Sequence, residues 1–298
     1  MKRFLKVSML IALVMLLAGV LLTVAGRAAG GRRQLSQLIS EKFLVTFYSN
    51  GDGGIEFDDS REIWTDDFQE ELSGQPGKLN IEAAGISVRV METEEKKIQV
   101  EGKNSEKVQC YVEDDTLYVK ARGREELLKD EASLGVVYLY LPSGMQFEEA
   151  AIDLGAGEVN MDVLNADRLD CSVGAGSLNI TRPQADTVYL DLGMGEINLY
   201  EATLKDVELD VGMGAAYLDG SITGDVTGAC GMGSLTMALA GAEEEHNYKV
   251  RTSMGSVSIG EDMGGAAGNW DIDHGADSNF DLSCAMGSIE IYFTNSEG

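Results

Sequence analysis

Histidine, cysteine, proline and basic residues are all scarce in this chain of 298 residues. It has 2 histidines and 4 cysteines, and no two cysteines form a C-x-x-C pair, which argues against a zinc cluster. With 3 prolines beside 36 glycines, the composition also argues against a disordered Pro/Gly tract. Lys and Arg number 23 against 50 Asp and Glu, and the resulting net charge of -27 repels nucleic acid.

The glycines recur at a fixed period. A Gly-x-Gly pair returns every nineteen residues within LGAGEVNM, VGAGSLNI, LGMGEINL, VGMGAAYL and CGMGSLTM, and two degenerate copies follow, TSMGSVSI and CAMGSIEI. A period of about twenty residues is typical of a solenoid, in which each coil stacks on the one before. The predicted corner glycines are Gly155, Gly157, Gly174, Gly176, Gly193, Gly195, Gly212, Gly214, Gly231, Gly233, Gly255 and Gly287.

Within one copy, the apolar positions change phase at the glycine pair. Ile152 and Leu154 alternate with polar residues, and the alternation resumes out of phase at Val159 and Met161. A strand changes phase only through a bulge or a corner, and glycine supplies the backbone freedom for it, including positive φ. The predicted fold class is therefore all-β, a single-stranded parallel β-solenoid (β-helix) with about 19 residues per coil and coils about 4.8 Å apart.

Stacked copies place equivalent side chains in columns. The predicted columns are Met194, Met213, Met232, Met254 and Met286; Asn160, Asn179 and Asn198; and Asp153, Asp191 and Asp210, interrupted by Ser172. The asparagines are expected to hydrogen-bond along the axis. Like charges at this spacing repel, so the aspartates are expected to form a hydrated acidic stripe, with a stripe that binds divalent cations or a basic ligand as the alternative.

The cysteines and histidines show no catalytic pattern. Cys171, Cys230 and Cys284 take positions that are aliphatic in other copies, which predicts buried apolar side chains rather than a redox pair. His246 and His274 accompany no recognisable nucleophile motif and are predicted to lie on the surface. The acidic residues recur without a unique pair, which argues against a glycosidase.

Two further motifs resemble ligand-binding loops, but a simpler interpretation is favoured for each. A dinucleotide loop needs a third glycine and a following helix, whereas a strand follows each Gly-x-Gly pair. The acidic residues near Gly275 suggest a calcium loop, but their spacing does not match the twelve-residue pattern, and a polar loop is favoured. The residues concerned are Asp271, Asp273, Asp277 and Asn279. No catalytic, cofactor-binding or metal-binding residue is predicted.

Residues 7–25 form an apolar run without a charge. Nineteen helical residues span about 28 Å, close to the hydrocarbon thickness of a bilayer, and exceed the apolar core of about 7–15 residues in a signal peptide. This predicts one uncleaved N-terminal transmembrane helix. Basic residues flank both ends of the run, but the short tail and long body favour an exported body. The predicted organisation is a basic tail at 1–6, the anchor at 7–25, a juxtamembrane segment and linker with little regular structure at 26–78, and the solenoid at 79–298.

The anchor and the repeated GAGEVN, GAGSLN, GMGEIN, GMGSLT, SMGSVS and AMGSIE motifs resemble those of a bacterial putative-adhesin family, a membrane-anchored β-strand-repeat domain of unknown function. The resemblance covers about residues 79–298 together with the anchor. It implies a membrane-tethered β-solenoid at the cell envelope, and members often occur with envelope-stress genes. The family has no catalytic residues to transfer to this chain.

These observations predict a non-enzymatic, single-pass membrane protein that presents an acidic solenoid, outside the cytoplasm, to an envelope protein or a cell-surface ligand. No cofactor and no nucleic-acid partner are expected. One alternative is a sensor or regulatory partner of another membrane protein in the envelope-stress response. Another is a polysaccharide-acting enzyme on a solenoid scaffold.

Overall fold

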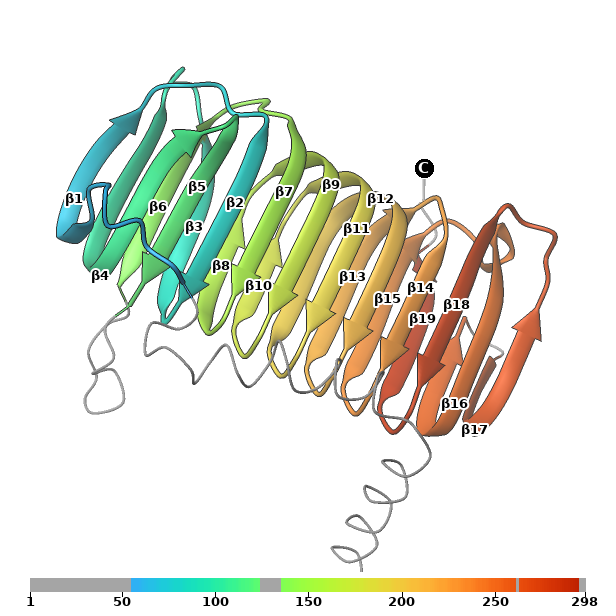
Figure 1. The fold of residues 1–298 in the computed structure, drawn as a ribbon. Coiled ribbons are helices and arrows are strands. Elements are labelled where there is room, and N and C mark those ends of the chain that lie inside the picture. Colours follow the sequence, from blue (N-terminus) through green and yellow to red (C-terminus); the bar gives the residue numbers. More distant parts are fainter. Residues whose placement is uncertain (1–54, 124–134, 261–262, 295–298) are drawn as a thin grey trace, which may run out of the picture. The chain divides into compact units, whose positions relative to one another are not determined.

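The computed structural model describes residues 55–123, 135–260 and 263–294 (Figure 1). This part of the chain is all-β and forms one long mixed sheet of nineteen strands. The predicted basic tail and the anchor at residues 7–25 lie outside the described residues. Among the residues that are described, no helix is both long and apolar enough to cross a bilayer.

The middle of the sheet is a regular, solenoid-like stack. Its strands are β7 (Phe147–Leu154), β8 (Gly157–Met161), β9 (Leu164–Val173), β10 (Ser177–Ile180), β11 (Pro183–Leu192), β12 (Glu196–Val211), β13 (Ala215–Ile222), β14 (Val226–Cys230) and β15 (Ser234–Ala240). Strand β10 pairs in parallel with β8 and β12, and Ser177 lies opposite Glu158 and Glu196, nineteen residues away on either side. Successive repeat copies therefore lie side by side in this part of the sheet.

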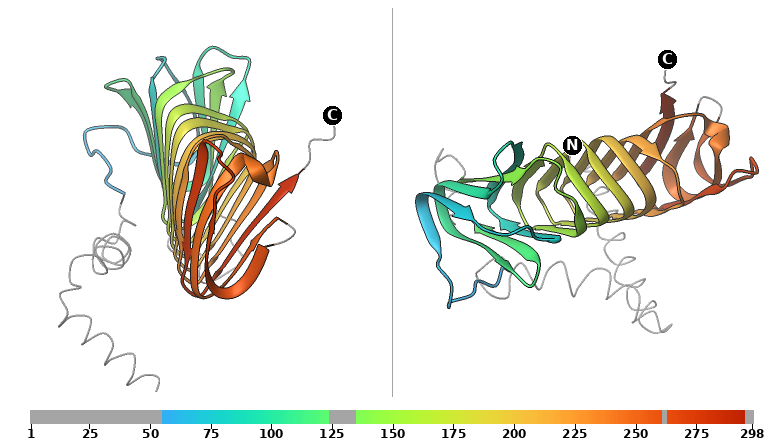
Figure 2. Two further views of the ribbon diagram at one scale, coloured as in Figure 1. Left: turned by 90° about the vertical axis from the view of Figure 1, so that its right-hand side faces the viewer. Right: turned by 90° about the horizontal axis from the view of Figure 1, so that it is seen from above.

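Seen along the stack, the strands form two faces that meet at a bend (Figure 2). The first face holds β7, β9, β11, the second half of β12, and β14, whereas the second face holds β8, β10, the first half of β12, β13 and β15. Ile152 and Leu154 on the first face and Val159 and Met161 on the second are all buried between the faces. The predicted change of phase is confirmed, and each such aliphatic side chain contributes about 1.5–3 kcal/mol.

The Gly-x-Gly pairs lie at the bend, where the backbones of neighbouring coils come very close. A Cβ atom added at Gly195, Gly214 or Gly233 would collide with the carbonyl oxygen of the corresponding glycine in the preceding coil, and one at Gly176 would lie 2.8 Å from the Gly157 oxygen. Among the twelve predicted corner glycines only Gly157, at φ 107, has a positive φ. The positive φ expected at these corners is therefore wrong for the other eleven, and close packing of coils is the stronger reason for glycine.

The N-terminal end of the stack does not follow chain order. Its strands are β1 (Trp64–Leu72), β2 (Lys78–Ala84), β3 (Ile86–Thr93), β4 (Ile98–Glu113), β5 (Thr116–Arg122) and β6 (Val136–Pro142). Strands β2 and β3 stack in parallel on β7 and β8, and β5 and β6 stack in parallel on β2 and β3. Strand β4 then runs antiparallel to both β5 and β6, and β1 runs antiparallel to β4. The expectation of a wholly parallel sheet is wrong at this end.

Strand β1 lies inside the segment 26–78 that was predicted to have little regular structure, and that prediction is wrong for residues 64–72. Trp64, Phe68 and Leu72 pack against the core, and the Trp64 and Phe68 rings lie 5.0 Å apart. The absence of a side chain at Gly102 makes room for the Phe68 ring. Only every fourth side chain of this strand is apolar and partly buried, so the period-two signal of a strand is absent from its sequence.

The C-terminal end is also out of chain order. Strands β18 (Ser278–Cys284) and β19 (Ser288–Thr294) stack directly on β14 and β15, and β16 (His246–Ile259) stacks on β18 and β19. Strand β17 (Met263–Ile272) returns antiparallel along β16. The copy around Gly287 thus precedes the copy around Gly255 in the stack, although it follows it in the chain.

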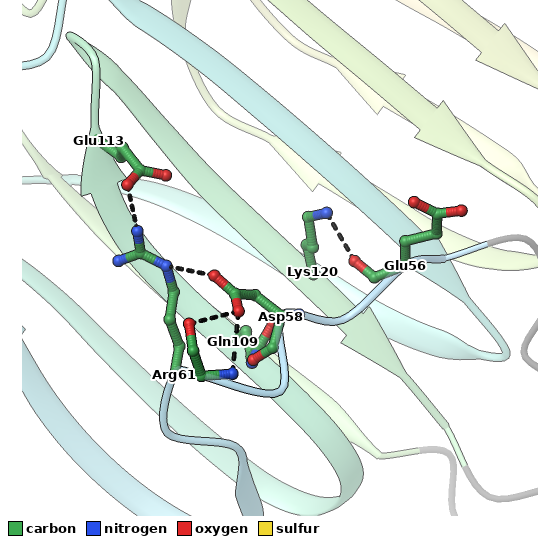
Figure 3. A network of polar contacts seen from close by, with 7 residues as sticks. Glu56, Asp58, Arg61, Gln109, Glu113 and Lys120 are labelled. Carbon is green, nitrogen blue, oxygen red and sulfur yellow. Dashed lines mark hydrogen bonds and ion pairs between the residues drawn. The ribbon is translucent and has the colours of Figure 1, made fainter.

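A network of polar contacts attaches residues 55–61 to strands β4 and β5 (Figure 3). The Asp58 N–H donates to Gln109 Oε1 at 2.9 Å, and Gln109 Nε2 donates to the Asp58 carbonyl at 2.7 Å. Gln109 is fully buried. Lys120 Nζ donates to the Glu56 carbonyl at 2.7 Å, and Arg61 Nε donates to Asp58 Oδ2 at 2.9 Å. The network fixes this segment against the N-terminal end of the stack, and it is called the latch below.

His246 is buried at the C-terminal end, so the prediction of a surface position is wrong. Ser278 Oγ donates its one hydrogen to the Gly224 carbonyl, which leaves it to accept from His246 Nδ1 at 2.8 Å. The imidazole centroid lies 4.5 Å from that of Phe280. Burial in this apolar setting lowers the pKa of His246 below its usual value, because desolvation disfavours the charged ring.

We expect Gly214→Ala to lower the free energy of unfolding by about 1–3 kcal/mol, the usual cost of overpacking. The new Cβ would collide with the Gly195 carbonyl oxygen, which accepts a hydrogen bond from the Ala215 N–H. Urea denaturation followed by circular dichroism measures the loss. Met213→Ala is the control, since alanine fills this position in two other copies. Equal stability of the two variants would contradict the close-approach explanation.

We expect Gln109→Ala to loosen the latch while leaving the stack folded. It removes both hydrogen bonds to the Asp58 backbone, each worth about 0.5–1.5 kcal/mol. Hydrogen exchange measured by mass spectrometry should show protection at residues 55–61 falling about tenfold or more, with β7–β15 unchanged. Lys103→Ala, an exposed change on the same strand, should leave both regions as they are. Unchanged protection at 55–61 in Gln109→Ala would refute this role for the buried amide.

The depressed pKa of His246 makes stability depend on pH. In the unfolded chain the pKa of histidine is about 6.5. Below that pH the unfolded chain binds a proton at His246 that the folded chain does not bind as readily. The free energy of unfolding present above that pH therefore decreases as the pH falls. We expect His246→Gln to lose less unfolding free energy than the wild type between pH 7 and pH 5. Carboxylate titration is common to both proteins and cancels in the difference. His274→Gln, at an exposed site, is the control. Parallel pH profiles for wild type and His246→Gln would contradict the expectation.

Candidate binding surfaces

The described part of the chain shows no grouping of the usual metal-binding side chains. Within it, no three His, Cys, Asp or Glu side chains are grouped so that they could hold a metal ion. His246 is buried, and His274 Nδ1 bonds to the His246 carbonyl at 2.8 Å. The candidates for function are therefore extended surfaces: the first face, the second face and the bend between them.

The first face carries the predicted aspartate column. Asp153, Ser172, Asp191 and Asp210 lie opposite one another on successive strands, as expected. The same column continues through alanine and serine and ends at Arg251. Partial desolvation and the charge of a neighbouring glutamate raise the pKa of the Asp210 carboxyl. This column is acidic over the middle coils, and toward the C-terminal end its Arg251 is ion-paired with Asp281.

The second face carries a neutral column of hydrogen-bonding groups, beside a column that contains Glu158, Ser177 and Glu196. Asn179 Nδ2 donates to Asn160 Oδ1 at 3.0 Å, and Asn198 Nδ2 donates to Asn179 Oδ1 at 2.9 Å, so the predicted asparagine ladder is confirmed. Asn179, the middle asparagine, both donates and accepts along the axis. On the next coils Tyr217 and Thr236 take the same column, so the column contains no charge from Asn160 to Thr236.

A tyrosine cluster continues this face. The ring centroids of Tyr200 and Tyr217 lie 5.6 Å apart, and the Tyr217 hydroxyl lies 3.4 Å from that of Tyr292. The hydrogen bond with Tyr292, together with desolvation, raises the pKa of Tyr217 to about 12. Tyr200 and Tyr292 remain 39% and 37% exposed. This cluster was not predicted from the sequence, although aromatic residues at exposed strand positions of one face were a usable signal.

The bend carries the methionine column, called the methionine ridge below. Backbone N–H groups of Met213, Met232, Met286 and Met254 donate in turn to the carbonyls of Gly193, Gly212, Gly231 and Ala285. The column predicted from the repeat is confirmed, with Met286 placed before Met254 because of the exchanged coils. Exposed fractions of the five side chains run from 51% at Met286 to 72% at Met254. These are most of the large apolar side chains that the described residues expose to solvent.

Two shallow pockets lie near the C-terminal end. The first, of about 380 Å³, is lined by parts of the loop considered as a calcium site, including Asp271, Asp273 and Asn279. There Asp273 Oδ1 accepts from the Gly275 N–H at 2.8 Å, and Asn247 Oδ1 accepts from two backbone N–H groups of the same loop. These oxygens are engaged in holding the loop, as the polar-loop interpretation expects.

The second pocket, of about 460 Å³, is lined in part by Cys230, Cys284 and Arg251. The two cysteines lie directly opposite each other on β14 and β18. Cys171, Cys230 and Cys284 are buried and unpaired, as predicted for apolar core positions, and so is Cys110. Burial raises the pKa of Cys230 to about 11, so its thiol is neutral at physiological pH and a poor nucleophile.

Comparisons with solved structures give matches at low sequence identity. A putative adhesin from Bacteroides fragilis NCTC 9343 is 13% identical, with 78% of this chain and 97% of that chain covered and a TM-score of 0.41. A putative adhesin from Parabacteroides merdae ATCC 43184 is 11% identical, with 76% and 96% covered and a TM-score of 0.40. A putative cell adhesion protein from Clostridium sporogenes ATCC 15579 is 14% identical, with 76% and 100% covered and a TM-score of 0.29. A search of curated proteins gives no match.

A family model described as Toastrack DUF4097 matches residues 77–274. The matched segment begins one residue before β2 and includes every coil of the regular stack. It spans well over half of the chain and contains most of the corner glycines on which the resemblance to adhesins rests. The chain therefore belongs to the Toastrack DUF4097 family.

Proposed function

We propose that this protein is a non-enzymatic, membrane-anchored envelope protein whose solenoid serves as a rigid, adhesin-like binding surface. The observation that carries the proposal is the second face, where the neutral asparagine column repeats in register over successive coils and continues into the tyrosine cluster. Backbone pairing fixes their spacing at about 4.8 Å. A surface ordered before contact loses little entropy on binding an extended ligand.

The placement in the cell is part of the same proposal. The apolar run at residues 7–25 would anchor the chain as a single transmembrane helix, with the solenoid on the extracytoplasmic side. Parallel coils of about 19 residues would make up the binding surface. The net charge of -27 keeps such a surface soluble and disfavours polyanionic partners.

The ligand that best suits the second face is a neutral, hydrogen-bonding polymer such as a cell-surface glycan. Asn160, Asn179 and Asn198 offer amide donors and acceptors, and the exposed rings of Tyr200 and Tyr292 offer apolar surfaces with a polar edge. Aromatic side chains of this kind are enriched at binding sites because they combine contact area with a hydroxyl group. The first face, with its carboxylates, is less suited to such a ligand.

A second function, as a sensor or regulatory partner of another membrane protein, is favoured by the latch. The buried Gln109 amide binds the backbone of residue 58, so the segment that precedes the stack is mechanically connected to it. Crosslinking in cells from the second face separates the two functions. A dominant membrane-protein partner would favour the sensor. The enzymatic alternative has less support, because the carboxylates of the first face recur without a distinct pair.

We expect full-length protein on beads to retain isolated bacterial envelopes, and Tyr200→Ala/Tyr217→Ala to reduce retention at least fivefold. The double variant removes two of the three tyrosines of the second-face cluster, whereas Arg168→Ala alters the first face only and is the matched control. Polysaccharide incubated with the protein should keep its chain length. Equal retention by both variants, or shortened polysaccharide, would contradict the proposal.

A further inference from the structure

The bend does not need the methionine side chains of the ridge in order to fold. In the two coils before Met194, the same position holds Ala156 and Ala175, and Ala175 makes the same backbone hydrogen bond to the preceding coil. A methyl group is therefore enough for this corner. From Met194 onward every coil instead exposes a long thioether to solvent, with 54–55% of the side chain accessible at Met194, Met213 and Met232.

The geometry of the ridge brings sulfur atoms within reach of one another. The backbone N–H of Met213 donates to the Gly193 carbonyl at 2.7 Å and that of Met232 to the Gly212 carbonyl at 2.8 Å, which fixes the coils about 4.8 Å apart. A methionine side chain has three rotatable bonds and adapts readily. Adjacent thioethers can therefore converge on one point above the bend without any movement of the backbone.

The side chains available at the bend determine which class of cation can bind there. Glycines flank Met194, Met213 and Met232 on both sides, and the one Asp, Glu or His within two residues of these methionines is Glu196. Hard cations such as Ca²⁺ and Mg²⁺ need several oxygen ligands, whereas soft thioether sulfur prefers Cu(I) among biological metals. A row of three thioethers with a single carboxylate beside it therefore suits a soft monovalent cation.

The distribution of charged side chains favours cation binding at the end of the ridge that holds Met194, Met213 and Met232. Asp191 and Asp210 lie near the ends of β11 and β12, three residues before Met194 and Met213, and the acidic column stops after Asp210. At the other end of the ridge, Arg251, which is ion-paired with Asp281, lies three residues before Met254. The field of the protein therefore attracts a cation to the first three thioethers more than to the last.

We propose that Met194, Met213 and Met232 form a surface site for a soft monovalent cation, Cu(I) or its chemical analogue Ag(I). The cation is held by two or three thioethers from successive coils, with the first-face aspartates supplying long-range attraction. The site is separate from the proposed glycan surface, because it lies at the bend and uses none of the second-face side chains. Metal binding and envelope retention are thus independently testable.

The test is a titration of the full-length protein with silver nitrate in chloride-free buffer, followed by NMR of ¹³C-labelled methionine methyl groups. We expect the Met194, Met213 and Met232 signals to shift first. The triple variant Met194→Leu/Met213→Leu/Met232→Leu keeps the apolar bulk but removes the sulfur, and should weaken Ag(I) binding at least tenfold. Met91→Leu, outside the ridge, is the control and should bind as the wild type does. Calcium at the same concentration should shift none of the three signals.

The buried thiols are the competing ligands, and a second variant separates them from the ridge. Cys230→Val/Cys284→Val places at both sites the residue found at the equivalent Val173 and Val211, and should retain the Ag(I) affinity of the wild type. Thermal unfolding of each variant, compared with the wild type, shows that the fold is kept. Absence of Ag(I) binding, unchanged binding in the leucine variant, or loss of binding in the valine variant would each overturn the proposal.

Discussion

The constraint on which the rest of the structure depends is the close approach of backbones at the bend. Each corner carbonyl accepts a hydrogen bond from the next coil, and a Cβ at the second glycine would occupy the space of that carbonyl oxygen. Because only glycine permits this approach, the coils stay in register across both faces. Equivalent side chains must then lie in columns, whether they are buried aliphatics, asparagines that bond to one another, or exposed methionines.

A stack of parallel strands has two open edges, and this protein closes both by the same topological device. At each end the chain skips one position in the stack and forms an antiparallel pairing outside it. The chain then returns, and the following strands fill the skipped position. Strand β4 and the hairpin of β16 and β17 are the outer elements. The outermost strand at the N-terminal end, β1, exposes Asp66, Asp67, Glu70 and Glu71, and charges on an edge strand oppose further pairing.

The regular coils could be predicted from the sequence because their signal is repetition itself. The phase change between Leu154 and Val159, the asparagine ladder and the buried cysteines all follow from one period. The exchange of the last two copies could not be predicted, since the copies around Gly255 and Gly287 fit either level equally well. What decides their order is the return strand β17, a Gly-rich segment with little alternation. Strand β1 was missed for a similar reason, and the anchor at residues 7–25 stays a prediction.

The surfaces were predicted less completely than the core, because periodicity reveals which residues share a column but not how each column meets solvent or its neighbours. The repeat placed Met213 beside Met232, yet it did not say that both would be more than half exposed. It also did not bring together Tyr217 and Tyr292, which are 75 positions apart and meet only because β19 fills the level beside β15. The stacking order of the strands thus brings together residues that no local sequence pattern connects.

A solenoid separates the requirements of folding from those of binding more cleanly than a globular core does. Inward columns and corner glycines carry the stability, so an outward column can change its chemistry at one coil without disturbing the next. The bend shows this freedom directly, with alanine in two coils and methionine in the following ones. Where an outward column repeats an apolar side chain that is exposed to solvent, such as methionine, the fold of the coil does not explain the repetition. The cause must then lie in what the column contacts outside the stack.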